Sequence, residues 1–559
     1  MASRMLKAAA LLVSVVSATT TTNLPIVDLG YERHQAISFN ETGGFYNFSN
    51  IRFAEPPIGE LRFRAPVAVT GKSTTVNNGS VGHICPQADP AWGAITALFV
   101  PDYLEGIPFN LTAAEIYLAN MSTGVLPKQD PRTSEDCLFL DVYPPKKVFQ
   151  QAPVSAAGGQ GAPVLVWIYG GGYTFGDKNN DGEYNPAGLI KASQISGSDG
   201  IVFVALNYRL GAFGWLGGPT LQSDGTANAG LYDQRLALEW VQENIHLFGG
   251  DKNRVTIMGE SAGGGSITHQ ITAYGGLGGK VPFHQAIPQS PAWQLIPGNA
   301  VPENTTQIFL KMLNVSTVAD ARKLPSMALI IANIIQVGGS QYGDFTFGPL
   351  VDGSFVPAPP GKLLLQGNFH KNLNILVGHN ADEGLDFTNP AITNNTIYND
   401  FVLVNFPDIQ TAAFDYITQT LYPPIFDGSQ GYKDEIGRAV KTISESSFIC
   451  NTNYLDRAFL NKTYAYQFDV FPALHGQDVP YTFYNGPNPS VANDTVAIAL
   501  QEYITSFVET GTPSAPHILK FPMYGSNSQI IDLGTTKISQ IMDDVIGSRC
   551  EWWQKALYY

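Results

Sequence analysis

The sequence has few charged residues, few cysteines and no long apolar segment after its first twenty residues. Charged residues make up 14% of the 559 positions and hydrophobic residues 44%, a composition typical of a folded globular chain and not of a disordered one. Four cysteines are too few for a small disulfide scaffold, and none has the C-x-x-C spacing of a zinc site. They leave either two structural bridges or four buried thiols.

Basic residues are also scarce. The chain has 32 Lys and Arg against 47 Asp and Glu, which gives a formal net charge of −15. An acidic surface repels phosphate backbones and anionic membranes. We therefore expect no nucleic-acid partner.

The first eighteen residues have the pattern of a secretory signal peptide. Arg4 and Lys7 precede an apolar run over 8–16, and small residues lead to a cleavage position near Ala18. The run is shorter than a membrane span, and no later segment is long and apolar enough for one. We expect residues 19–559 to form a secreted chain without a transmembrane anchor.

The chain carries ten Asn-x-Ser/Thr sequons, and an export signal makes glycosylation expected at several of them. Secretion also favours disulfides over free thiols. The sequon asparagines are Asn40, Asn47, Asn78, Asn110, Asn120, Asn304, Asn314, Asn394, Asn461 and Asn493.

From about residue 160 onward, short apolar runs alternate with helical patterns. Continuous apolar runs of this length are typical of strands buried on both faces of a parallel sheet. The runs cover 164–168, 201–206, 255–258, 374–377 and 463–468, and the helical patterns cover 231–248 and 496–508. Because there is no internal repeat and the Gly- and Ala-rich stretch 150–161 is best explained as a surface loop, we predict one α/β domain over 19–559.

The segment Gly259-Glu-Ser-Ala-Gly263 matches the G-x-S-x-G pattern of a nucleophile elbow. An apolar strand leads into it and the small residues 262–266 follow it, which is the context that a sharp strand-to-helix turn requires. Ser261 is thus the candidate nucleophile. A serine hydroxyl needs a base to take its proton and an acid to orient that base, and in this kind of fold both come later in the chain.

At these residues the chain resembles the type-B carboxylesterase/lipase family, which includes cholinesterases and secreted fungal lipases. The resemblance covers nearly the whole mature chain and rests on three blocks, at 51–63, 134–144 and 248–263. It implies an α/β-hydrolase fold, with a large, mostly parallel central sheet flanked by helices and with lid or cap insertions. It also implies hydrolysis of a small-molecule or lipid ester without a metal or organic cofactor.

The same resemblance assigns the acid and the base. Glu383, in Gly378-His-Asn-Ala-Asp-Glu-Gly384, corresponds to the acid, and His475 to the base. The competitors are Asp382 and Asp386 for the acid and His379 for the base. As loop carboxylates, the two aspartates are expected to be solvated or to cap local turns.

The oxyanion hole is expected in the glycine-rich turn after the strand 164–168. By the resemblance, the donors are the backbone N–H groups of Gly171, Gly172 and Ala262, and glycine permits the close approach that they need. Supporting roles fall to Glu260, beside the nucleophile, and to Ser290, expected to hydrogen-bond Glu383.

Further family pairings concern cysteines and charges. The resemblance pairs Cys85 with Cys137 and Cys450 with Cys550, and it implies ion pairs of Arg62 with Glu135 and of Arg209 with Asp233, for which the alternative is ordinary surface charge. Asp478 stands where the family more often has glutamate, a shortening that could alter the polarity of the pocket.

The loop between Cys85 and Cys137 is a candidate lid. It contains the apolar stretch 91–100 and a helical stretch over 112–121, where Thr112 and Glu115 resemble a capping box. Two interpretations of this loop remain: an apolar lid over the active-site gorge, or a packed surface hairpin. In cholinesterases a cation-binding tryptophan lies shortly before the second cysteine of this loop. The corresponding stretch here, 127–133, contains no tryptophan, so a choline-type site is disfavoured.

Three functions therefore remain in order of preference. The first is a secreted carboxylesterase that cleaves uncharged esters through an acyl-enzyme. The second is a true lipase or sterol esterase with a lid in the first disulfide loop. The third, from another class, is a non-catalytic adhesion protein related to cholinesterases, which the presence of Ser261, Glu383 and His475 disfavours.

Overall fold

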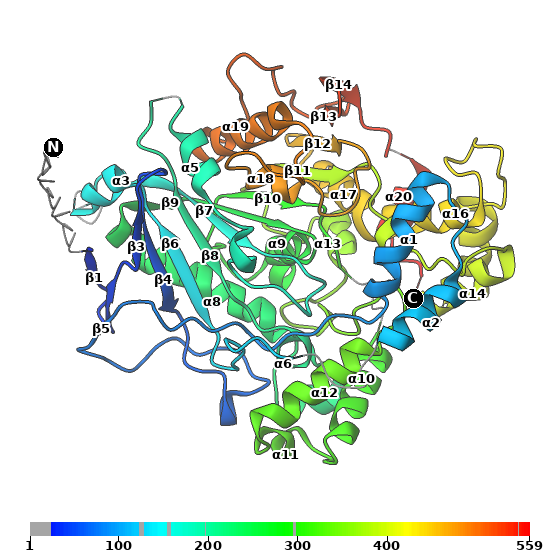
Figure 1. Ribbon diagram of the computed structural model, residues 1–559, viewed down its shortest axis with the longest axis horizontal. Helices are drawn as coiled ribbons and strands as arrows, with labels where there is room; N and C mark the ends of the chain where they lie inside the picture. Colours follow the sequence, from blue (N-terminus) through cyan, green and yellow to red (C-terminus); the bar gives the residue numbers. More distant parts are fainter. Residues whose placement is uncertain are drawn as a thin grey trace, which may run out of the picture.

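The structure is a computed structural model that describes residues 24–121, 128–153, 158–195, 197–293, 298–407, 409–545 and 547–558. The signal peptide predicted for residues 1–18 lies outside these ranges. Within them, an 11-stranded mixed sheet runs through the middle of the molecule, with helices on both sides of it (Figure 1).

The strands of the large sheet follow the order β14-β13-β12-β11-β10-β9-β7-β8-β6-β4-β3. Those from β13 to β8 are parallel, and the strands at both edges are antiparallel. Their bounds are β3 Ser38–Asn40, β4 Phe45–Arg52, β6 Phe139–Tyr143, β7 Ala162–Ile168, β8 Val202–Leu206, β9 Gly250–Glu260, β10 Gln285–Gln289, β11 Asn374–Asn380, β12 Tyr464–Asp469, β13 Gln529–Gly534 and β14 Ile538–Met542. A small separate sheet holds β1 Ile26–Asp28, β2 Arg33–Gln35 and β5 Val76–Asn77.

All five predicted strands lie in the parallel part of the sheet, which confirms the predicted α/β class. β8 is buried at every position, and β7 at every position after Ala162. Helices on both faces exclude water from these strands, which explains why their sequences are continuously apolar and do not alternate.

The two predicted helices are also present. α8 (Ala229–Asn244) continues into a short 3-10 turn, η3 (Ile245–Phe248). α19 (Asp494–Thr510) begins after Asn493, whose side chain accepts hydrogen bonds from the N–H groups of Thr495 and Val496. It ends at Gly511, which has a left-handed conformation, the usual helix stop.

The remaining helices surround the sheet and its carboxyl edge (Figure 1). They are α1 Gly93–Glu105, α2 Leu111–Met121, α3 Lys146–Gln150, α5 Ala187–Ser193, α6 Gly211–Trp215, α7 Gly218–Gln222, α9 Ala262–Thr272, α10 Ala300–Met312, α11 Val318–Arg322, α12 Ser326–Gly338, α13 Pro360–Gln366, α14 Asn395–Asn405, α15 Thr411–Tyr416, α16 Glu435–Ile443, α17 Cys450–Ala458, α18 Val479–Thr482 and α20 Ser548–Gln554. Among the residues that the structure describes, no helix combines the length and the apolar character that crossing a bilayer requires.

The candidate lid forms two helices, α1 and α2. α1 packs against the loop after β11 and against α16, through a small apolar cluster that includes Phe99, Val100 and Leu385. The predicted capping box at Thr112 is wrong, because α2 begins one residue earlier, at Leu111. There the Asn110 side chain accepts the hydrogen bond from the Ala113 N–H at 3.0 Å.

Both cysteine pairs form disulfides, Cys85 with Cys137 and Cys450 with Cys550, with Cα atoms 5.0 and 5.1 Å apart. The two expected ion pairs are present as well. Arg62 binds Glu135 and Arg209 binds Asp233, each with a shortest N–O distance of 2.7 Å and with side chains that are almost fully buried. Ordinary surface charge therefore does not describe them.

Candidate active site

The nucleophile elbow lies between β9 and α9. Ser261 has φ of 57° and ψ of −123°, a conformation that is strained for a residue with a Cβ. The glycines on either side make the turn possible: a Cβ on Gly259 would lie 2.5 Å from the Ile168 carbonyl oxygen, and one on Gly263 only 2.0 Å from it. The turn places Ser261 at the carboxyl edge of the sheet, on the N-terminus of a buried helix.

The structure brings Ser261, His475 and Glu383 together. His475 Nε2 lies 2.8 Å from Ser261 Oγ, and His475 Nδ1 lies 2.6 Å from Glu383 Oε2. Glu383 is fully buried, and its other oxygen accepts hydrogen bonds from the Ser290 hydroxyl at 2.7 Å and from the Asn380 N–H at 2.6 Å. Each of the three residues comes from a different strand end, so the sheet itself sets their spacing.

The competing residues take other places. His379 is buried on β11, with Nδ1 3.4 Å from the Thr452 hydroxyl. Asp382 and Asp386 flank Glu383, and the Nδ1 hydrogen bond of His475 goes to Glu383 and not to them. They were expected to be solvated or to cap local turns. Both are partly buried, and this burial, assisted by neighbouring carboxylates, raises the pKa of each to about 6.

The glycine-rich turn after β7 lies directly against the nucleophile. A Cβ on Gly170 would be 2.9 Å from the Ser261 Cβ, and Gly171 and Gly172 have φ of 92° and 57°, where a side chain would be strained. Ala262, the third expected donor, is the first residue of α9. The glycine-rich turn and the first residue of α9 therefore both adjoin Ser261, and the roles of their N–H groups as oxyanion donors stay a prediction.

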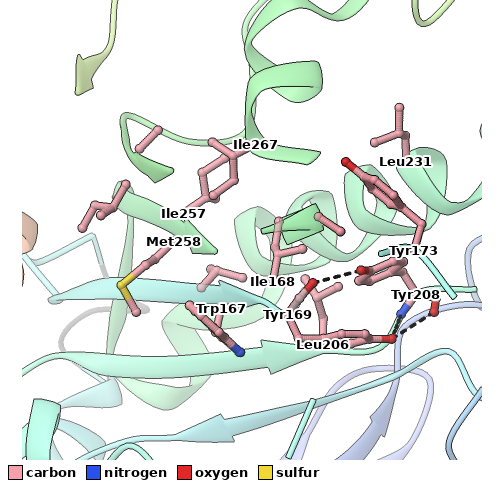
Figure 2. Packing of buried hydrophobic residues seen from close by; sticks show 14 of the residues in the cluster. Trp167, Ile168, Tyr169, Tyr173, Leu206, Tyr208, Leu231, Ile257, Met258 and Ile267 are labelled. Atoms are coloured by element: carbon pink, nitrogen blue, oxygen red, sulfur yellow. Dashed lines mark hydrogen bonds between the residues drawn. The ribbon is translucent and has the colours of Figure 1, made fainter. Parts of the chain in front are cut away.

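Two tyrosines hold that turn in place. Tyr169 and Tyr208, at the ends of β7 and β8, stack with ring centroids 4.5 Å apart. The Tyr169 hydroxyl donates to the Tyr208 carbonyl at 3.1 Å, and the Tyr208 hydroxyl donates to the Tyr169 carbonyl at 2.9 Å (Figure 2). Since Tyr169 immediately precedes Gly170, these two reciprocal hydrogen bonds hold the start of the glycine-rich turn in position.

Glu260 lies beside the candidate base. Its Oε1 is 3.4 Å from His475 Nε2, and the side chain is buried. Burial raises the pKa of Glu260 to about 8, against the opposing effect of His475. Burial alone would lower the pKa of His475, but the charges of Glu260 and Glu383 outweigh it and raise that pKa to about 9.

Replacing Glu260 by Gln should shift the acid limb of the pH profile of kcat/KM to lower pH. A base must be neutral to act, and the Glu260 charge favours the protonated imidazole, so its removal lowers the pKa of His475 by about one unit. Hydrolysis of a soluble ester, measured from about pH 5 to about pH 11 with the uncatalysed rate subtracted, brackets the limb and gives the shift. Glu502→Gln, on the distant helix α19, is the control and should leave the limb where it is. An unmoved or raised limb in Glu260→Gln would contradict the expected effect of its charge.

Asp478 anchors a buried polar network behind the triad. Its Oδ2 accepts hydrogen bonds from the Tyr466 hydroxyl at 2.8 Å and from Gln289 Nε2 at 3.2 Å. Burial raises the pKa of Asp478 to about 6. The roles of Gln289 and Tyr466 in this network were not predicted. A polar residue inside an apolar strand indicates only that its side chain needs a hydrogen-bond partner, not which residue supplies it.

Several aromatic side chains surround the site and were not predicted either. Phe387 and Phe448 contact the His475 ring at centroid distances of 5.1 and 4.5 Å. Phe345 covers Gly172, since a Cβ there would lie 2.2 Å from the Phe345 ring, and Trp92 contacts Phe345. Only Trp92 could have been suspected from the sequence, because it lies in the apolar stretch 91–100 of the candidate lid. No sequence pattern marks Phe345 or Phe448 as residues near the site.

The ten sequon asparagines all lie within the described residues, and none is fully buried. Six are exposed: Asn78, Asn110, Asn120, Asn304, Asn314 and Asn394. Four are partly buried: Asn40, Asn47, Asn461 and Asn493.

Comparison with known proteins gives a consistent result. A family model described as the carboxylesterase family matches residues 33–553. Carboxylesterase patB of Aspergillus clavatus is 45% identical over 542 residues, which cover 95% of this chain and 96% of that protein. A secreted lipase of Arthroderma benhamiae is 31% identical over 455 residues, 77% of this chain and 84% of that protein.

Among solved structures, Aspergillus niger EstA superposes with a TM-score of 0.77 at 26% sequence identity, over 95% of this chain and 98% of that one. The family match extends across the sheet, the elbow and both disulfides. This chain therefore belongs to the carboxylesterase family and is a carboxylic ester hydrolase with the α/β-hydrolase fold.

Proposed function

We propose that this protein is a secreted serine carboxylesterase that hydrolyses uncharged esters through an acyl-enzyme. One observation carries the proposal: the hydrogen bonds of 2.8 and 2.6 Å that connect Ser261, His475 and Glu383 in a chain. A hydroxyl whose proton faces an imidazole, itself oriented by a buried carboxylate, is the arrangement that activates serine as a nucleophile.

The reaction proceeds in two halves. In the first, Ser261 Oγ attacks the ester carbonyl while His475 Nε2 takes the hydroxyl proton, and the same imidazolium then protonates the leaving alcohol. In the second, His475 takes a proton from water, the hydroxide attacks the acyl-enzyme, and the acid leaves as Oγ recovers its proton. The N–H groups of Gly171, Gly172 and Ala262 stabilise both negatively charged intermediates.

Glu383 keeps the base in the correct tautomer. A carboxylate that accepts the Nδ1 proton leaves Nε2 as an acceptor, facing Ser261. Ser290 and the Asn380 N–H fix the other oxygen of Glu383, so the carboxylate cannot rotate away from the ring.

Uncharged esters suit the surroundings of the site. Partly exposed aromatic rings from Trp92, Phe345 and Phe387 lie near it, and the carboxylates of Glu383 and Asp386 contribute negative charge close to His475. An ester with an anionic group would be repelled, and the product acid, once ionised, would be driven out by the same charges.

Secretion and a single domain complete the proposal. The export pattern at residues 1–18, the exposed sequons and the two disulfides all suit an extracellular protein, and one relative is named a secreted lipase. We expect residues 19–559 to fold as one unit around the large sheet.

A lipase is the second candidate, and helix α2 is the observation that favours it. Ile116, Tyr117 and Met121 on this helix are each more than half exposed, as in a lid that opens at a lipid surface. The lipase reading requires a jump in rate when a triglyceride passes from solution into emulsion. The carboxylesterase reading is preferred, because the relatives at 44% and 45% identity are both named carboxylesterases.

Labelling with a fluorophosphonate probe tests the proposal. The purified protein should be labelled at one residue, Ser261, with loss of ester hydrolysis in proportion to labelling. Ser261→Ala should take no label and should retain its fold, as measured by circular dichroism. Ser266→Ala, in the same buried helix, is the matched control and should label like the wild type. A folded wild-type protein that takes no label would rule out the serine mechanism.

A further inference from the structure

The His475 ring is held within its own plane but needs support on its faces. Its two hydrogen bonds, to Glu383 and Ser261, both lie along the ring plane. Such bonds resist movement of the ring within its plane but offer little resistance to a displacement perpendicular to that plane. Such a displacement would carry Nε2 out of line with Ser261 Oγ, and misplacement of a catalytic group by about 1 Å can lower a rate about a hundredfold.

Phe448 and Phe387 supply that support. Phe448 is the nearer ring, with its centroid 4.5 Å from the imidazole centroid, and Phe387 meets the imidazole edge to face at 5.1 Å. The two phenyl rings stack on each other at 5.1 Å. Phe448 is buried, with 5% of its surface exposed, so surrounding protein restricts its movement.

Phe448 owes its direction to an unusual turn. It lies in η7 (Ser444–Ile449), a π-helical turn between α16 and α17. A π turn has one residue more than an α-helical turn, which rotates the following side chains relative to a regular helix, and such turns occur often at functional sites. The turn also touches the acid loop: a Cβ on Gly384 would lie 2.7 Å from the Ser444 hydroxyl.

The C-terminal helix α20 packs against η7. The Cys450–Cys550 disulfide joins α20 to the residue that follows η7. Glu445, buried in η7, pairs with Arg549 of α20 at 3.3 Å and accepts a hydrogen bond from the Tyr422 hydroxyl at 2.7 Å. That hydroxyl in turn accepts from Trp553 Nε1 at 2.9 Å. Because its buried polar groups have these partners, η7 is held in a single conformation.

We propose that Phe448 is a positioning residue for His475, and that Glu445 and helix α20 act on catalysis through Phe448. The inference rests on the proposed role of His475 as the base. It assigns a catalytic consequence to a C-terminal segment that touches none of the three triad residues directly.

The first test separates positioning from substrate binding. Phe448→Leu keeps an apolar side chain, of smaller volume, but removes the flat ring, and we expect kcat per active site to fall about tenfold with KM changed less than about twofold. Phe448→Tyr keeps the ring and should retain most of the activity. Fluorophosphonate titration counts the competent active sites, so a loss of folded protein does not enter kcat.

The second test asks whether Glu445 acts through Phe448. Glu445→Gln should lower kcat with Phe448 intact, and the double variant Glu445→Gln/Phe448→Leu should lose little more than Phe448→Leu alone, because two changes on one pathway are not additive. Glu435→Gln is the matched control. Glu435 is equally buried, lies on the adjacent helix α16 and pairs with Arg438, but it should leave kcat unchanged.

The outcomes are distinguishable. A Phe448→Leu variant with unchanged kcat, or with only KM altered, would overturn the inference. So would losses from Glu445→Gln and Phe448→Leu that multiply in the double variant. If Phe448→Leu does not fold, the comparison of Glu445→Gln with Glu435→Gln decides the matter. Absence of labelling in the wild type would instead defeat the proposed function.

Discussion

Replacing Glu383 by Gln is expected to lower kcat about 10⁴-fold while the protein remains folded. The amide has the same shape as the carboxylate but places an NH₂ group among groups that donate to it. His475 Nδ1, the Ser290 hydroxyl and the Asn380 N–H are all directed at its oxygens. If the NH₂ faces His475, Nδ1 becomes the acceptor, the proton moves to Nε2, and the ring can no longer take the Ser261 proton.

The measurement is kcat for a soluble ester, normalised to the number of folded molecules. Asp382→Asn is the control, because Asp382 is the adjacent carboxylate and its pKa is also raised by burial. It should keep activity within about tenfold of the wild type, since it does not orient the base. If Asp382→Asn lost as much activity as Glu383→Gln, the assignment of the acid would be wrong.

The nucleophile could be predicted from the sequence because the requirements of the elbow are local. Gly259, Ser261 and Gly263 lie within five residues, and the closest clash of a side chain at either glycine is with the same atom, the carbonyl oxygen of Ile168. The acid and the base are different. His475 is 214 positions from Ser261, and only the register of the sheet brings them together, so their assignment depended on resemblance to a family.

The central parallel strands could be predicted for a similar reason. Strands buried on both faces are apolar at every position, whereas β3 and β14 at the edges mix exposed and half-buried residues and have no clear period. The π turn that carries Phe448 could not be predicted, because its extra residue interrupts the helical period by which a buried face is recognised. The cap of α2 was wrongly placed because Asn110 and Thr112 both suit an N-cap.

The buried pair of Arg209 and Asp233 should contribute strongly to the free energy of unfolding. Asp233 is fully buried and accepts three hydrogen bonds from Arg209: from its N–H at 3.0 Å, from Nε at 2.8 Å and from Nη2 at 2.7 Å. The remaining nitrogen, Nη1, is buried without a hydrogen-bond partner. Asp233 is thus the acceptor that compensates the buried guanidinium charge.

Asp233→Ala is therefore expected to lower the free energy of unfolding by about 3–5 kcal/mol, because it leaves a buried cation with no counter-charge. Asp320→Ala removes the carboxylate of a solvent-exposed pair, with Lys323, and should destabilise the protein far less, because water screens an exposed ion pair. Urea unfolding followed by tryptophan fluorescence compares the two variants. The double replacement Arg209→Met/Asp233→Leu removes the charge together with its partner and should recover part of the loss. If Asp233→Ala were no less stable than Asp320→Ala, the pair would have to be solvated, and the buried environment assigned to Arg209 would be wrong.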